Sequence, residues 1–278
     1  MCGGWMYNQV IKKSYFINLA RSTKRRNIFE HQTSKLGIKN VERYEAVDIV
    51  DYLKQNQPTY YNKNEDSKDR IYGYGLTYSN LDLMMKIVAD GTIDDDDYVA
   101  IYEDDVVFLD DFHNEFNETF SYFENRKFDI INLGSLIQPI ISDKNEAVSN
   151  RLVKINTPGI FLTQALVYRK GALRDIVEIF NAIFRAVNGS PDTKTSNIVV
   201  DHIMSNQIYP EFESYSCYPP ITYQLADRSL IQNNEYKFIN PILRQKKKIL
   251  NGSILKSCKN NIYEQCKLEN FKDSNEEE

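Results

Sequence analysis

Residues 98–105 read YVAIYEDD, a run of five apolar or aromatic residues that ends in three carboxylates, Glu103, Asp104 and Asp105. A continuous apolar run of this kind is typical of a parallel strand covered on both faces. In open α/β sheets, ligands bind beyond the carboxyl ends of the strands. The stretch therefore predicts a buried strand with an acidic site at its end.

Strand-like and helix-like patterns alternate on both sides of this stretch. Further strand candidates cover residues 14–19, 41–47, 128–133 and 161–168. Helix candidates follow Ser22, run from Thr77 or Ser79 to Gly91 with apolar residues at 81, 84, 85 and 88, and cover 112–123 and 173–187. Spacings of three and four residues mark the apolar face of each helix. The alternation predicts a doubly wound α/β domain.

The chain has 278 residues and is 42% hydrophobic, which suits one large domain. We expect residues 1–240 to form that domain. Residues 51–69 are polar without a period and predict an inserted loop. Residues 241–278 are first basic and then acidic, and we expect them to form a loosely ordered extension.

The composition restricts the classes of protein and the cell compartments that are consistent with this sequence. A net charge of -5 with interspersed basic residues argues against a nucleic-acid binder. Four cysteines without a CxxC pair indicate a reducing compartment and no zinc site. Without a signal-like or membrane-spanning apolar run, we expect a cytoplasmic protein. Residues 244–248 carry four positive charges that could contact anionic lipid, so peripheral membrane contact is a second expectation.

The three carboxylates are the first candidate site. An isolated acidic triplet is most often a solvated loop. Here it follows a buried strand, and adjacent carboxylates repel each other unless a cation or a proton neutralises them. Glu103 and Asp105 can face the same way because side chains alternate along a strand. The pattern therefore indicates a divalent metal site.

Two further segments carry candidate residues. Residues 19–26 (LARSTKRR) lie between the first strand and the first helix, where backbone N–H groups and arginines can hold a diphosphate. A basic helix start is also often only a solvated face. Asp201 precedes His202, and either could be a base or a metal ligand. Adjacent side chains point in different directions, so we favour Asp201.

The order of motifs resembles glycosyltransferase family 25, which includes bacterial lipopolysaccharide and lipooligosaccharide galactosyltransferases and the collagen galactosyltransferases. The resemblance spans about residues 14–225, and the most specific parts are Gly75 to Leu81 and the Glu-Asp-Asp signature. The other matching segments are Phe16–Leu19 with Arg21 and Arg25, Arg43–Asp48, Asp129–Gly134, Ala165–Ala172, Val200-Asp201, Pro220 and Gln224. Two positions depart from the family pattern. Asn80 replaces a usual histidine and cannot transfer a proton near neutral pH, and Ile49 replaces a glycine.

The resemblance implies a GT-A-type, Rossmann-like nucleotide-sugar-binding fold with a mixed, mostly parallel sheet. It implies a UDP-sugar donor, usually UDP-galactose, Mn²⁺ or Mg²⁺, and inversion at the sugar carbon. The acceptor would be a carbohydrate such as a lipooligosaccharide or a protein-linked glycan. Asp201 would be the base, and Asp105, Glu103 and His202 would bind the metal. Donor-binding residues would be Asn18, Leu19, Arg21, Arg25, Asp48, Ser79, Glu103 and Asp104.

Two alternatives remain open from the sequence. A metal-dependent nucleotidyltransferase also places carboxylates at strand ends but releases pyrophosphate. A catalytically silent carbohydrate-binding protein is suggested by Asn80 and by 19 tyrosines that could stack on sugars. Tyrosines are more simply explained by strand and core packing.

Overall fold

The computed structural model describes residues 5–49, 51–52, 68–137, 145–189 and 199–224. Its α-helices are α1 (Trp5–Val10), α2 (Thr23–Lys35), α4 (Lys68–Ala89), α5 (Phe112–Phe120), α6 (Lys170–Gly189) and α7 (Val200–Ile203). Three short turns of other helix types are η1 (Ser121–Phe123), η3 (Met204–Ile208) and η4 (Tyr209–Glu211).

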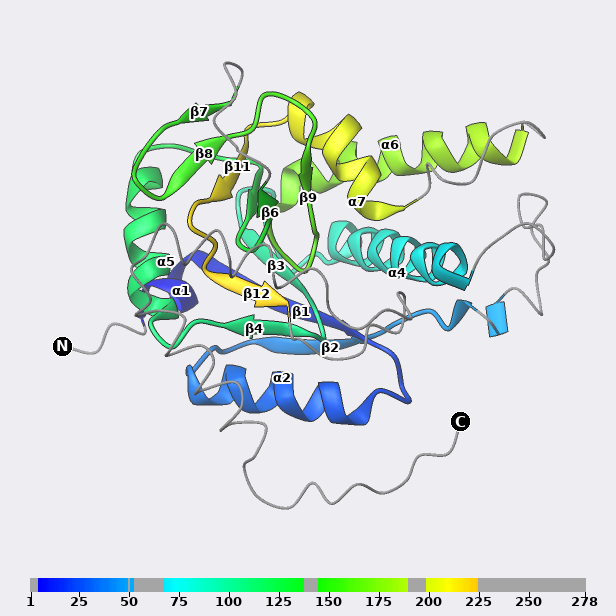
Figure 1. Ribbon diagram of the computed structural model, residues 1–278, viewed down its shortest axis with the longest axis horizontal. Helices are drawn as coiled ribbons and strands as arrows, with labels where there is room; N and C mark the ends of the chain where they lie inside the picture. The colour runs from blue at the N-terminus through cyan, green and yellow to red at the C-terminus, as the bar shows by residue number, and fades with distance from the viewer. Residues whose placement is uncertain (1–4, 50, 53–67, 138–144, 190–198, 225–278) are drawn as a thin grey trace. The chain divides into compact units, whose positions relative to one another are not determined.

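The strands of the main sheet are β1 (Ile11–Asn18), β2 (Val41–Glu45), β3 (Tyr98–Glu103), β5 (Ile130–Asn132), β7 (Glu146–Ala147), β8 (Leu152–Lys154), β10 (Ala165–Arg169) and β11 (Ser214–Cys217). They lie in the order β2-β1-β3-β10-β5-β11-β8-β7. Figure 1 shows β2, β1 and β3 toward one side of the sheet and β11, β8 and β7 toward the other. β10 and β8 are antiparallel to both of their neighbours, and the other strands share one direction. This mixed sheet confirms the predicted α/β class. Two small sheets pair β4 (Val106–Phe108) with β12 (Thr222–Gln224) and β6 (Leu136–Ile137) with β9 (Ile160–Phe161).

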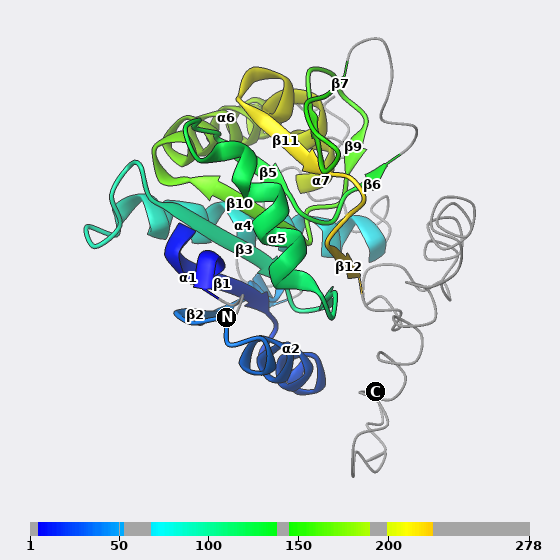
Figure 2. The same cartoon turned by 90° about the vertical axis from the view of Figure 1, so that its left-hand side faces the viewer.

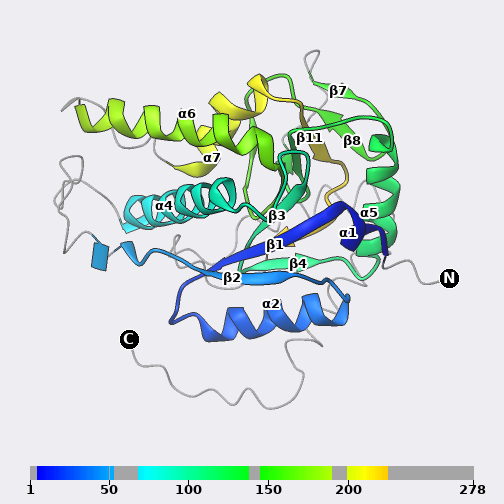
Figure 3. The same cartoon turned by 180° about the vertical axis from the view of Figure 1, so that it is seen from behind.

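The central strands are buried on both faces. Tyr15 and Ile101 pack in one core with α4, α6 and α7. Phe16 and Tyr102, their neighbours along β1 and β3, pack in a second core with α1, α2 and α5. Figures 2 and 3 show these two helix layers from the side and from behind. Because alternate side chains face opposite cores, both faces of β3 must be apolar, which explains its continuous hydrophobic run.

The long helix before β3 differs from its prediction. α4 begins at Lys68, not at Thr77 or Ser79. Thr77 and Ser79 lie inside the helix, where each hydroxyl donates to the carbonyl four residues earlier instead of capping the first turn. A Cβ on Gly75 would lie 3.0 Å from Cβ of Ile49. The glycine thus permits close packing within a helix and does not mark a helix start.

The strand predicted over 161–168 is also interrupted. β9 ends at Phe161 and pairs with β6, whereas β10 begins at Ala165 and joins the main sheet. Between them, Leu162 has a φ of 71°, a left-handed conformation that breaks a strand. The three intervening residues therefore form a tight turn that brings Thr163 and Gln164 to the end of β3.

Several predictions concern residues that the structure does not describe or describes only in part. Most of the predicted loop at 51–69 and all of the extension at 241–278 lie outside the described ranges and stay predictions, as does the basic segment 244–248. Cys217 is a buried free thiol. In the described part of the chain, no helix is long and apolar enough to cross a membrane.

Candidate active site

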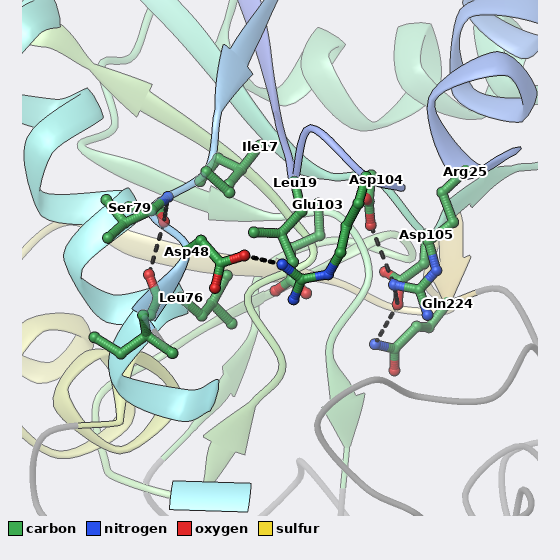
Figure 4. Close-up of a pocket in the computed structure, with 15 residues that line it drawn as sticks. Ile17, Leu19, Arg25, Asp48, Leu76, Ser79, Glu103, Asp104, Asp105 and Gln224 are labelled. Carbon is green, nitrogen blue, oxygen red and sulfur yellow. Dashed lines mark hydrogen bonds and ion pairs between the residues drawn. The ribbon is translucent and has the colours of Figure 1, made fainter. Parts of the chain in front are cut away.

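Three parallel strands, β2, β1 and β3, end at the same edge of the sheet, and a pocket lies at that edge (Figure 4). The pocket is lined by Ile17, Leu19, Arg21, Arg25, Ala46, Val47, Asp48, Ile49, Gly75, Leu76, Ser79, Glu103, Asp104, Asp105 and Gln224. Most of the residues predicted to bind donor or metal are in this set. The exceptions are Asn18 and His202.

Asp104 is held by protein groups. Asn18 donates from Nδ2 to Asp104 Oδ2 at 2.7 Å, and Arg25 donates from Nη1 to Oδ1 at 3.2 Å. Burial raises the pKa of Asp104, and the charge of Arg25 opposes that effect. Both carboxylate oxygens are thus engaged, so Asp104 joins the end of β3 to the start of α2. This placement favours a supporting role for Asp104.

Asn18 lies beside the pocket and does not line it. Its side chain is buried, and Arg43 donates from Nε to Asn18 Oδ1 at 2.9 Å and from Nη2 to the Asn18 carbonyl at 3.2 Å. Both ends of the Asn18 amide are therefore bonded to other side chains. The sequence places Arg43 in a family motif, but only the structure shows that it fixes Asn18.

Glu103 is half-buried and Asp105 is buried, and among the described residues the two acids have few hydrogen-bond donors. Asp105 Oδ2 accepts from Gln224 Nε2 at 3.1 Å and lies 3.6 Å from Arg25 Nη1, while its buried Oδ1 has no hydrogen-bond partner in the described structure. Burial raises the pKa of Asp105 to about 6, against the effect of Arg25. Burial, followed by the charges of Asp105 and Asp201, raises the pKa of Glu103 well above its usual range. A cation or a proton would relieve this pair.

Asp201 lies near this pair, although it does not line the pocket. It belongs to α7, and its Oδ1 accepts from Thr163 Oγ1 at 2.8 Å. The same Thr163 hydroxyl lies 3.2 Å from Glu103 Oε1. Burial raises the pKa of Asp201. The fold thus brings together two carboxylates that are far apart in the sequence, through a threonine that the sequence did not single out.

His202 points elsewhere. Its side chain is exposed, and its ring packs against Phe161 with centroids 5.7 Å apart. It is not among the lining residues of the pocket. Adjacent residues on a helix diverge, so the side chain of Asp201 and that of His202 do not share one site. The structure does not bring His202 to Asp105, and its predicted metal role gains no support from this placement.

The far wall of the pocket is formed by an ion pair and a buried hydroxyl. Arg21 and Asp48 form a close ion pair, and both side chains are partly exposed. Ser79 Oγ accepts from the Val47 N–H at 2.9 Å and donates to the Gly75 carbonyl at 2.7 Å. Ser79 therefore fixes the segment after β2 on α4. Arg21 is the more accessible of the two arginines at this edge.

Asn80, at the position where the resemblance expects histidine, lies outside the pocket lining. Its side chain is 2% exposed, and Nδ2 donates to the Leu76 carbonyl at 3.0 Å. This bond stays within α4 and satisfies a buried amide. In this chain the position supports the helix beside the pocket.

The carboxylate oxygens at Asp105 and Glu103 are ligands that suit a hard divalent cation, but they supply only part of its coordination. Among the residues that the structure describes, no group of three or more His, Cys, Asp or Glu side chains is arranged to hold a metal ion. Mg²⁺ sites in nucleotide-dependent enzymes often use only one or two carboxylates, with substrate phosphates and water as the other ligands. The unpartnered Asp105 Oδ1, with Glu103 beside it, fits that pattern.

The comparison with known protein families agrees with the motifs. The family model described as glycosyltransferase family 25 (LPS biosynthesis protein) matches residues 11–204. A crystal structure of a glycosyltransferase involved in the glycosylation of the major capsid of PBCV-1 is similar over 78% of this chain and 93% of that chain, with 9% identity and a TM-score of 0.41. No curated protein matches the chain significantly. The family model covers more than half of the chain, and the chain therefore belongs to glycosyltransferase family 25, whose members transfer sugars.

Proposed function

We propose that this glycosyltransferase moves a sugar, most simply galactose, from a UDP-sugar to a carbohydrate acceptor with inversion at the transferred carbon and with help from Mn²⁺ or Mg²⁺. One observation carries the metal and diphosphate part of the proposal. Asp105 Oδ1 is buried at the end of β3, beside the pocket, without a hydrogen-bond partner in the described structure. A buried, unpartnered carboxylate oxygen is destabilising unless something cationic or protonated contacts it.

Asp105 and Glu103 would hold the divalent cation. When bound, the cation would neutralise the charge that develops on the departing diphosphate. Asp104 would support this edge through its bonds to Asn18 and Arg25. The carboxylates alone would repel a diphosphate, so donor binding in this pocket should depend on the cation.

The arginines supply the other part of a diphosphate site. Arg21 lines the same pocket as Asp105 and is paired with Asp48 at a partly exposed position. A diphosphate would compete with Asp48 for the guanidinium of Arg21, since arginine binds phosphate in a bidentate geometry. The backbone at Leu19 lies in the same wall of the pocket. Arg25 is shared between Asp104 and Asp105 and would hold the carboxylates in place.

Asp201 is the proposed base for the acceptor hydroxyl. An inverting displacement needs one group that accepts the proton of the attacking hydroxyl. The raised pKa of Asp201, caused by burial, makes it a better proton acceptor than an ordinary exposed carboxylate. The Thr163 hydroxyl joins Asp201 to the donor side of the site. The acceptor class, a lipooligosaccharide or a protein-linked glycan, is proposed from the family alone.

The test is product analysis with a panel of UDP-, GDP- and CMP-sugars. Donor binding is first measured as a thermal shift with and without Mn²⁺, because a ligand that binds only the folded state raises its melting temperature. We expect a shift with a UDP-sugar that needs Mn²⁺, and UDP release from UDP-galactose when a sugar acceptor is present. Absence of UDP release from every UDP-sugar with Mn²⁺ would contradict the proposal. Pyrophosphate release from a nucleoside triphosphate would instead favour nucleotidyl transfer.

A further inference from the structure

Thr163 occupies an unusual place between two functional carboxylates. It lies in the turn between β9 and β10 and is 4% exposed. Its single hydroxyl lies 2.8 Å from Asp201 Oδ1 and 3.2 Å from Glu103 Oε1. A hydroxyl carries one proton, so it donates to one carboxylate at a time, and the shorter distance marks Asp201 as the main acceptor. Thr163 thus joins the proposed base to the donor-side acid.

The residues on either side of Thr163 are fixed to neighbouring strands. The Leu162 carbonyl accepts from Asn132 Nδ2 in β5 at 2.7 Å, and Asn132 also bonds the Tyr209 hydroxyl at 3.1 Å. The Gln164 carbonyl accepts from the Glu103 N–H in β3 at 2.8 Å. Because the backbone is bonded on both sides, the Thr163 side chain has little freedom to move away from the two carboxylates.

Leu162 holds this turn in a conformation that non-glycine residues rarely adopt. Its φ of 71° lies in the left-handed region, which is unfavourable for a residue with a Cβ. Such conformations persist where surrounding contacts impose them, and they are frequent at functional sites. The backbone of Leu162 also lowers the pKa of Asp201, against the larger effect of burial.

We propose that Thr163 is a positioning residue of the transfer reaction, which holds the Asp201 carboxylate at a fixed place relative to Glu103. This inference rests on the proposed function, because it assumes that Asp201 acts on the acceptor and Glu103 on the donor side. Reacting groups must be aligned closely, and a displacement of about 1 Å can lower a rate by about 100-fold. Removal of the hydroxyl should therefore slow turnover and leave donor binding almost unchanged.

The experiment compares Thr163→Val, Thr163→Ala and Thr163→Ser by steady-state kinetics with the UDP-sugar and acceptor that the wild-type chain uses. A hydrogen bond to a charged group corresponds to roughly 10- to 100-fold in rate. We expect kcat to fall by that factor in Thr163→Val and Thr163→Ala, with the donor KM within about 2-fold of wild type. Thr163→Ser keeps the hydroxyl and should stay within about 3-fold of the wild-type kcat.

Thr33→Val is the matched control. Thr33 is also 4% exposed, but its hydroxyl bonds only the Phe29 and Glu30 carbonyls of its own helix. Its kcat should stay within about 2-fold of wild type, since mutations in the scaffold leave aligned groups in place. If Thr163→Val lowers kcat no more than Thr33→Val does, or if Thr163→Ser is as slow as Thr163→Ala, the positioning role is wrong.

A double-mutant cycle separates positioning from folding. On an Asp201→Asn background, Thr163→Val should lower the residual kcat by less than about 2-fold, because both changes remove the same function. If the two substitutions instead lower kcat by independent factors that multiply, the inference is wrong. This outcome does not depend on how stable the variants are. If the wild-type chain releases no UDP, the proposed function fails and this inference fails with it. If the wild-type chain releases UDP normally and Thr163→Val has the wild-type kcat, only the inference about Thr163 is wrong.

Discussion

Two acidic clusters flank the same strand, and they have opposite physical characters. Asp94 to Asp97 precede β3, are mostly exposed and form ion pairs with basic residues of several elements. Glu103 is the last residue of β3, Asp104 and Asp105 follow it, and all three side chains are largely or partly buried at the pocket. The pKa of Asp96 is lowered by its bond to Lys127, whereas burial raises the pKa of Asp105 to about 6. Their similar composition therefore gives a solvated turn at one end of β3 and a largely buried acidic site at the other.

The largest expected difference between the two acidic clusters is in sugar-transfer activity. Asp105→Ala should lower metal-dependent sugar transfer by about 10³-fold, because a cation that stabilises transition-state charge contributes several kcal/mol. Asp96→Ala, at the other end of the same strand, should stay within about 2-fold of wild type. UDP release with Mn²⁺ is the measurement. Turnover by Asp105→Ala at the wild-type rate, still dependent on metal, would show that the proposed metal site is wrong.

The next contrast is the pH dependence of stability. The pKa of Asp105 is about 6 in the folded protein against 3.8 for an ordinary aspartate, so the folded state binds an extra proton between these values. Stability from this group is therefore present at low pH and is lost as the pH rises from about 4 to 6. Asp105→Asn, in metal-free buffer with EDTA, should raise the free energy of unfolding at pH 7 by up to about 3 kcal/mol.

The gain should shrink toward zero as the pH falls to about 4, and urea unfolding at a series of pH values measures it. Asp96→Asn is the control. Its exposed carboxyl has a lowered pKa because of Lys127, so its substitution should give no gain at pH 7. A gain in Asp105→Asn that is equal at every pH would point to altered packing and not to a buried charge.

The smallest expected effect is on the surface pairs of the first cluster. Lys127 Nζ lies 2.7 Å from Asp96 Oδ1, and both side chains are 68% exposed. Exposed pairs of this kind contribute little, so Lys127→Ala should change the free energy of unfolding by less than about 0.5 kcal/mol. Thermal and urea unfolding would measure it. A decrease of more than about 1 kcal/mol in the free energy of unfolding would mean that this cluster contributes more to stability than a solvated turn does.

Much of the fold can be predicted from local patterns. The apolar run of β3, the Phe112 to Phe123 stripe and the periodic helix before β3 all lie where their spacing predicts, because burial on one or two faces leaves a clear period. The start of α4 could not be predicted in this way. Thr77 and Ser79 have the composition of a helix start, but α4 begins before them, and contacts with residues distant in sequence, Ile49, Val200 and Val47, hold this part of the helix.

The candidate site is predictable only where it follows strands. Glu103 ends β3, Asp104 and Asp105 come directly after it, and Leu19 to Arg25 follow β1, so the strand rule locates them. Gln224, Arg43 and Thr163 act through contacts with residues 25 to 119 positions away, which a single sequence does not show. His202 shows the opposite limit. It was a candidate metal ligand beside Asp201, and its ring packs against Phe161 outside the pocket lining.

The reversed direction of β10 has a consequence for how such sites are found. β10 is antiparallel to β3, with Ala165 opposite Tyr102, so its first residue, not its last, lies at the end of the sheet that carries the acidic pocket. Lys170, which follows β10, lies at the other edge and donates to the Asp90 carbonyl. A search for functional residues that considers only the residues after each strand would select Lys170 here and would miss Thr163. In a mixed sheet of this kind, the loop before an inverted strand belongs to the same search.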